Sequence, residues 1–355
     1  MVSIVSVLGL LGFSPAALGE VPGWRPAPAT NPLEFGSLRL EPAFALAPAE
    51  GEWEASFVVS EFNLWNHTWH TFATHRARDL YRQPVTDEEL RYIERDFAGD
   101  RVWHLDLEGW RTDLTLSRGL AGGRSVTLRI PWIEIGSPHW DRFGEEFHEL
   151  FGLTSLEREV FPRGETLVYI KDRDNRHIIE ARDELERKGI GDVSIALGIP
   201  LRPRWGAEHR LVAALEAPTG KEGTLHGSGG WDASLQWFAV WTGDRKSIRT
   251  GAGATFLDPN GSFLGEERAH LFHLYLQMDR HLWRRVSGTF GVRIDGSPLW
   301  SVIHELPGYP STIYRFGLVG DLGTSWVAFD FDEELHPQTG VEADWAFHLS
   351  WGRAF

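Results

Sequence analysis

The last fifteen residues of the chain, 341–355, alternate strictly between two kinds of side chain. Successive side chains of a β-strand point to opposite faces, so this stretch predicts a strand with one apolar and one polar face. Membrane barrels use tilted strands of about ten residues with aromatic belts at both interfaces. The stretch therefore predicts an all-β protein, a transmembrane antiparallel β-barrel. Its apolar positions are Trp345, Phe347, Leu349 and Trp351, its polar ones include His348 and Ser350, and it ends on Phe355.

Composition excludes a helical membrane protein. The chain of 355 residues has 17 Trp and 21 Phe, yet its mean hydropathy is -0.26. A membrane-spanning helix needs about twenty successive apolar residues, and no such run follows residue 19. The lack of Cys fits an exported protein. A net charge of -15 argues against nucleic acid as a partner and suits acidic outer loops that face lipopolysaccharide.

The N-terminus has the pattern of an export signal. An apolar core leads to the small residues Ala17 and Gly19, which predicts a signal peptide over 1–19 and an outer-membrane location in a Gram-negative bacterium. The first basic residue is Arg25, whereas export signals carry a basic residue before the core. An uncleaved N-terminal anchor is the alternative.

Alternating segments fill the chain from residue 52 to residue 355. Their connections are short and long in turn, as in bacterial barrels with tight periplasmic turns and long outer loops. Counting back from the C-terminus gives about 12 strands in the barrel 52–355. The Pro-rich segment 20–51 holds one more extended element, 35–47, which crosses the lumen, caps it, or brings the wall to 14 strands.

Two early strands change the parity of their apolar residues. The change occurs after Ser60 in the first strand and past Gly109 in the second. A β-bulge at each position would reconcile the two halves of each strand.

The long insertion 136–189 contains a predicted helix, 138–151. Ser137 can cap its start and Gly152 can end it. One face of the helix is aromatic and would act as a plug or lid over the lumen, or else lie on the outer leaflet or the barrel rim. That face carries Trp140, Phe143, Phe147 and Phe151.

Two sets of polar loop residues are candidates for a metal site and for a catalytic site. His67, His70 and His75 stand in one loop as weak candidates for metal ligands, although polar loop residues explain them as well, and we expect neither a metal nor a cofactor. His226 and Ser228 are similar to the His–Ser pair of the outer-membrane phospholipase, but no Asn partner is visible. Nucleophilic catalysis is therefore the less favoured interpretation, and we expect that the protein is not an enzyme.

The polar faces of the strands are the better candidate site. Charged side chains on the lipid face would cost about 2 to 4 kcal/mol each at mid-membrane, so they should point inward. There they line a pore, or they pair with one another across a filled barrel. The predicted inward residues are Arg111, Asp113, Arg129, Arg202, Gln236, His273, Asp279, Arg293, Asp295 and Arg315.

Several blocks resemble an uncharacterised, domain-of-unknown-function family of Gram-negative outer-membrane β-barrel proteins. The blocks lie at 29–36, 104–120, 147–162, 189–201 and 215–235. The resemblance implies a barrel that contacts outer-membrane lipid and lipopolysaccharide and that is inserted by the outer-membrane barrel assembly machinery. It assigns no catalytic residue.

These observations favour a channel or transporter for small solutes, gated or plugged by the insertion 136–189. The solute is unknown. A lipid-modifying enzyme and a non-conducting structural or surface-binding barrel are the alternatives.

Deleting Phe355 should sharply reduce assembly, because the aromatic end of the last strand resembles the terminal strand that the assembly machinery recognises. The measurement is the amount of heat-modifiable, folded protein in the outer membrane. A normal amount would remove the main support for the barrel prediction.

Overall fold

A computed structural model describes most of the chain. The described residues are 23–32, 35–136, 157–171, 188–221, 223–258, 270–297, 310–334 and 345–355, with short pieces at 142, 145–146, 149–150, 152, 173–174 and 177–181. The predicted signal peptide lies outside the described residues.

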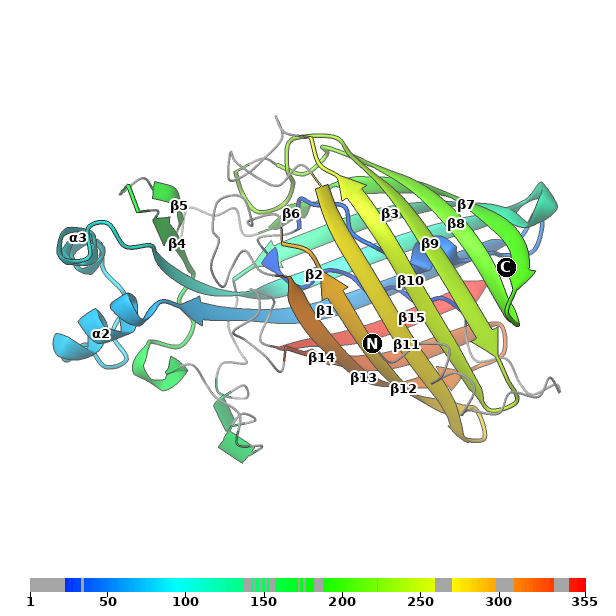
Figure 1. Ribbon diagram of the computed structural model, residues 1–355. Coiled ribbons are helices and arrows are strands. Elements are labelled where there is room, and N and C mark those ends of the chain that lie inside the picture. Colours follow the sequence, from blue (N-terminus) through cyan, green and yellow to red (C-terminus); the bar gives the residue numbers. More distant parts are fainter. Residues whose placement is uncertain are drawn as a thin grey trace.

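Twelve antiparallel strands form a closed barrel, which confirms the predicted fold (Figure 1). Each strand pairs with its neighbours in sequence, β1 pairs with β15, and the β2–β3 and β3–β7 pairings complete the ring. The strands are β1 (Trp53–His67), β2 (Val102–Leu120), β3 (Arg124–Ile135), β7 (Val193–Arg204), β8 (Ala207–Ala217), β9 (Asp232–Thr242), β10 (Lys246–Phe256), β11 (His270–Trp283), β12 (Val286–Asp295), β13 (Ser311–Asp321), β14 (Ser325–Glu333) and β15 (Trp345–Ala354).

The connections between strands alternate in length, as expected. At one end of the barrel the links are tight, such as the 3-10 turn η3 (Ala121–Gly123) and the pair Trp205–Gly206. At the other end they are long. No helix among the described residues is long and apolar enough to cross a membrane.

The outward face of the wall is apolar and exposed. On β11 the exposed side chains include Phe272, Leu274, Leu276 and Met278, which alternate with buried residues. In β15, Leu349 is exposed while His348 and Ser350 are buried, as the alternation predicts, whereas Trp345, which shares the parity of Leu349, is only 2% exposed. A continuous band of this kind is the surface that a bilayer covers.

A second, smaller core lies beyond the long-loop end of the barrel. It contains helices α2 (Trp69–Ala77) and α3 (Asp87–Asp96), the turn η4 (Arg158–Val160) and strand β4 (Leu167–Lys171), which pairs with the start of β2. Strand β5 (His177–Ala181) pairs with β4, whereas β6 (Lys188–Ile190) pairs with β3. Figure 1 shows α2, α3, β4 and β5 projecting past the barrel.

We call this unit, residues 66–106 with 157–181, the external subdomain. Its apolar side chains cluster around the fully buried Phe161, whose ring contacts Trp65, His75 and His104. Thr86 caps α3 by accepting a hydrogen bond from the backbone N–H of Glu89. Strands β1 and β2 thus belong to the wall at one end and to this core at the other.

The predicted bulges at Ser60 and Gly109 are wrong. The pairing of β1 with β2 and β15 runs through both positions without a register shift. Beyond Ser60, Phe62 stays on the inward face and packs against Phe35 at 5.1 Å between ring centroids. The apolar residues change parity because the environment changes: inside the strand end lies the N-terminal segment, and outside it lies the external subdomain.

The predicted helix 138–151 is only partly described. Arg142, Glu145 and Leu150 are helical, but Trp140, Phe143, Phe147 and Phe151 lie outside the described residues. Glu145 pairs with Arg82 at 2.9 Å and with Arg163. Burial raises the pKa of Glu145, but hydrogen bonds from Arg163 and Arg82 outweigh burial and hold that pKa below its usual range.

Replacing Phe161 with Ala should unfold the external subdomain and leave the barrel intact. A buried Phe→Ala change costs about 3 to 5 kcal/mol, and Phe161 is the centre of this small core. Hydrogen exchange should rise over 69–96 and 157–171 while heat-modifiability persists. The control is Trp69→Ala, since Trp69 is 67% exposed in the same unit. Equal exchange in the two variants would show that Phe161 does not organise the subdomain.

Candidate functional site: the filled lumen

The described residues of 23–46, namely 23–32 and 35–46, lie inside the barrel, and the segment folds back on itself. Near Ala45 the segment is at the short-turn end, where Arg210 donates hydrogen bonds to the carbonyl groups of Ala45 and Gly123. Gly36 lies at the long-loop end, against the backbone of Ser228. Arg25 is back near the short turns, beside Asp279. We call this segment the luminal segment; in Figure 1 it is the dark blue trace within the barrel.

Three wall arginines hold the first part of the luminal segment by its backbone. Their guanidinium groups donate to four successive carbonyl oxygens: Arg315 to Pro26 at 3.5 Å, Arg293 to Ala27 at 2.8 Å and Pro28 at 3.3 Å, and Arg111 to Ala29 at 3.5 Å. Proline has no backbone N–H group, so this stretch buries few donors that need partners. The Pro-rich sequence therefore suits a wall that offers donors.

Charged side chains of the luminal segment pair with the wall as well. Arg25 is 2.9 Å from Asp279, and Arg39 is 3.3 Å from Asp295. Glu41 lies 3.7 Å from Arg129, whose stronger partner is Glu216 at 2.9 Å.

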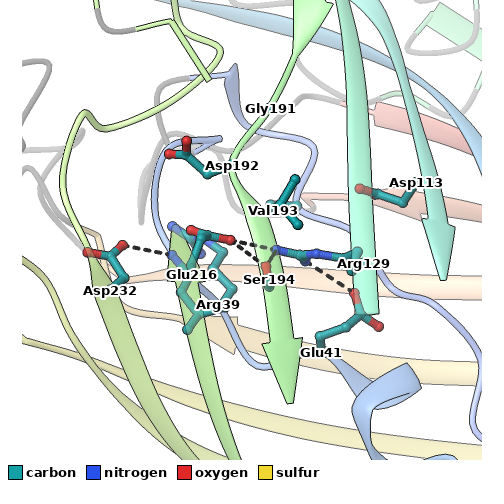
Figure 2. Close-up of polar contacts among 12 residues, drawn as sticks. Arg39, Glu41, Asp113, Arg129, Gly191, Asp192, Val193, Ser194, Glu216 and Asp232 are labelled. Atoms are coloured by element: carbon teal, nitrogen blue, oxygen red, sulfur yellow. Dashed lines mark hydrogen bonds and ion pairs between the residues drawn. The ribbon is translucent and has the colours of Figure 1, made fainter. Parts of the chain in front are cut away.

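Figure 2 shows Arg129 between the two glutamates, with Ser194 bridging to Glu216. Asp232 accepts a hydrogen bond from the backbone N–H of Leu38, at 3.1 Å. The luminal segment is therefore bound through its backbone and through its side chains.

Most wall arginines also have an acidic partner within the wall itself. Arg111 pairs with Asp113 at 2.9 Å, two residues along the same strand face. Arg315 forms a two-point contact with Asp332 on the neighbouring strand, both distances being 2.6 Å. His348 joins Asp332 at 3.0 Å and Ser60 at 2.7 Å. These pairs do not depend on the luminal segment.

Apolar contacts fill the space that the charges leave. Leu38, Leu40 and Phe44 form one cluster with wall residues such as Phe238 and Tyr275. A Cβ atom added at Gly251 would lie 3.3 Å from Leu40 and 2.8 Å from Phe238, so the glycine admits these side chains. Beside Ala27 and Tyr275 a cavity of about 10 Å³ remains, which is room for about one water molecule.

Nine of the ten predicted inward residues are buried, none more than 7% exposed. Seven of them contact the luminal segment directly, namely Arg111, Arg129, Gln236, Asp279, Arg293, Asp295 and Arg315. Asp113 and His273 contact it through Arg111 and Asp295. Whether these residues also line a conducting pore stays a prediction.

Arg202 is the exception among the ten. It has the inward parity of β7, but it lies at the short-turn end, past Gly198, the last residue paired with β3, and within the register irregularity between Leu201 and Arg204. The side chain is exposed and borders an open groove of about 520 Å³ with Trp205 and Trp237. The odd or even position of a residue in a strand does not by itself show where the regular pairing of that strand ends.

Several luminal charges were missed by the sequence reading. Asp330 and Asp332 have the inward parity of β14 and were detectable by the same rule. Arg249 stands in a glycine-rich strand whose alternation is weak, and it pairs with Asp279. For Arg25, Arg39 and Glu41 no periodic signal exists, because the described residues of the luminal segment are irregular apart from a 3-10 position at Pro32 and the short turn η2 (Pro42–Ala45).

The three candidate histidines of the first long loop contact three different carboxylates. Nitrogen–oxygen distances are 3.7 Å for His67 and Glu157, 3.3 Å for His70 and Asp100, and 2.8 Å for His75 and Glu89. Such separate pairing is the arrangement of structural side chains, and it gives no support to a shared metal.

Ser228 and His226 are both buried. The Ser228 hydroxyl group contacts Asp192 at 3.4 Å and the backbone of Gly230, while Nδ1 of His226 contacts Thr224 at 2.7 Å. A Ser nucleophile needs a base in hydrogen-bond reach that is itself oriented by a third group. These contacts place Ser228 in a loop that holds the tip of the luminal segment, and they add nothing to the enzymatic alternative.

The family model described as "Protein of unknown function (DUF3187)" matches residues 45–254, more than half of the chain. The chain belongs to this family. The match confirms the resemblance to a family of unknown function, and it covers the wall from β1 to β10. No curated protein matches the sequence.

A solved outer-membrane barrel shares the fold of this DUF3187 member. The COG4313 outer membrane channel from Pseudomonas putida F1 has a TM-score of 0.51 at 11% identity, over 89% of this chain and 100% of that one. The Ralstonia pickettii toluene transporter TbuX also matches, with a TM-score of 0.41 at 9% identity, over 92% of this chain and 98% of that one. The Pseudomonas putida toluene transporter TodX matches with a TM-score of 0.40 at 8% identity, over 94% of this chain and 99% of that one. The first of these likenesses shows the outer-membrane barrel fold.

Replacing Arg293 with Ala should destabilise the protein by about 3 to 5 kcal/mol, because the change removes one partner of a buried ion pair with Asp295. Urea unfolding measures the loss. Arg202→Ala is the control, since an exposed arginine should change stability by about 0.5 kcal/mol or less. A loss below about 1 kcal/mol in Arg293→Ala would show a hydrated lumen in which water screens the pair.

Proposed function

We propose that this protein is an outer-membrane channel or transporter for small solutes, closed by its own luminal segment. The observation that carries the proposal is the way in which residues 23–46 are held. Hydrogen bonds and ion pairs to wall side chains hold these residues in the lumen. Their covalent connection to the wall is the backbone alone.

The wall can lose the luminal segment without stranding most of its own charges. Arg111, Arg293 and Arg315 keep Asp113, Asp295 and Asp332 as partners after the carbonyl groups leave. Water can replace the carbonyl oxygens as acceptors. An opened lumen would therefore be a polar, charge-paired surface, which suits passage of small solutes.

The path of the segment also permits its withdrawal. Both of its described ends lie toward the short turns, and only its tip at Gly36 reaches the long-loop end. A loop inserted from one end can retreat through that end without threading its terminus past the wall. In the outer membrane this end would face the periplasm.

The predicted lid helix 138–151 remains a second proposed gate on the outer side. Its described residue Glu145 is tied to Arg82 and Arg163. The helix would then move with the external subdomain rather than with the luminal segment.

Deleting residues 23–46 should convert a nearly closed barrel into a conducting one. The reason is that these residues and their contacts fill the space between the wall side chains. Single-channel recording in planar bilayers measures the change, after heat-modifiability confirms that the variant is folded. A folded variant without conductance would refute the channel and leave a structural barrel.

A point substitution gives a finer version of this test. In Gly36→Ala the new Cβ would lie 2.5 Å from the backbone nitrogen of Ser228, so the tip must shift. We expect more frequent openings. Gly23→Ala is the matched control, because the nearest atom to its Cβ is 3.8 Å away.

A further inference from the structure

A compact group of metal-ligating side chains lies at the base of the external subdomain, apart from the lumen. His104, Asp106 and Glu165 each offer one ligand atom, and these atoms all lie within 4.8 Å of one another. His104 and Asp106 are fully buried, and Glu165 is half-buried. Groups of this composition are costly to bury unless a cation or a hydrogen-bond network compensates them.

The three side chains come from fixed positions on β2 and on the segment before β4. His104 and Asp106 share one face of β2, two residues apart, in the part of the strand that pairs with β4. Glu165 precedes β4 and accepts a hydrogen bond from the backbone N–H of Val85 at 3.1 Å. Bulky rings confine the imidazole of His104, with Trp65 at 5.3 Å and Phe161 at 5.0 Å between centroids.

The neighbouring arginine leaves the charge balance suitable for a divalent ion. Arg158 is 3.3 Å from Glu108 and 3.5 Å from one oxygen of Asp106. A carboxylate can serve an arginine with one oxygen and a metal with the other. With Arg158 opposite Glu108, the carboxylates of Asp106 and Glu165 supply two negative charges to the group.

We propose that His104, Asp106 and Glu165 bind a divalent transition-metal ion of the Zn²⁺ class, with water at the fourth position. An imidazole with two carboxylates suits Zn²⁺, whereas Mg²⁺ and Ca²⁺ prefer oxygen ligands alone. Zinc–ligand distances are about 2.0 to 2.2 Å, so small rotations of the side chains would close the site. The ion would connect β2 with the residues before β4. The loop before α3 would be connected indirectly, through the hydrogen bond from Val85 to Glu165.

The test uses the full chain, purified without a histidine tag and treated with a chelator. Titration with Zn²⁺ is followed by calorimetry, and titration with Co²⁺ is followed by its visible absorption, which reports coordination directly. We expect one ion per chain, with much weaker binding of Mg²⁺ and Ca²⁺. The variant His104→Ala should lose at least about tenfold in affinity.

Two further variants separate a ligand role from a folding role. Glu165→Gln keeps an oxygen for the Val85 N–H group but is a poor metal ligand, so it should also lose binding while hydrogen exchange near Val85 stays slow. His70→Ala removes a histidine of the same subdomain that faces Asp100, and it should bind as the wild type does. Absence of Zn²⁺ binding, equal affinity in Glu165→Gln and wild type, or equal loss in His70→Ala would overturn the proposal.

Discussion

The pairing of buried charges in the lumen is the constraint on which the rest of the structure depends. A barrel of twelve strands is wider than one that its own side chains fill, yet its wall alternates, so half of its residues must face inward. Here that inner face carries arginines and carboxylates that are almost fully buried. Each needs a partner, and the wall and the luminal segment supply those partners together. The segment is thus part of the folded interior, not an appendage.

The composition of the luminal segment follows from the same constraint. Its carbonyl oxygens accept hydrogen bonds from Arg111, Arg293 and Arg315, and its prolines bring no donors that would compete. Hydrogen bonds to charged groups contribute about 1.5 to 3 kcal/mol each, so several of them together hold the segment in the lumen. The ion pairs between wall residues do not include the segment. This division between permanent wall pairs and exchangeable carbonyl contacts is what makes a removable plug physically reasonable.

Strands β1 and β2 connect two different interiors. Within the barrel their inward residues meet the luminal segment, as Phe62 meets Phe35. Three residues later, Trp65 lies in the core of the external subdomain with Phe161. Polar residues on β2, such as His104 and Asp106, are buried there as well, because loops cover the outer face of the strand. One continuous strand pair therefore links the lumen to a compact unit outside the barrel.

The sequence by itself determined the barrel, its twelve strands and the inward parity of most of the charged residues, because each strand repeats a two-residue pattern that hydrocarbon enforces. In β15, Leu349 is exposed while its neighbours His348 and Ser350 are buried. Only the tertiary structure decided what fills the lumen and where the alternation of polar and apolar residues stops distinguishing the inward face from the outward face. The luminal segment is irregular, so no period marks Arg25, Arg39 or Glu41. After Ser60 in β1 and before Gly109 in β2, both faces of the strands are covered by protein. The polarity of a residue there no longer shows which way its side chain points, and the sequence of a single strand does not reveal that cover.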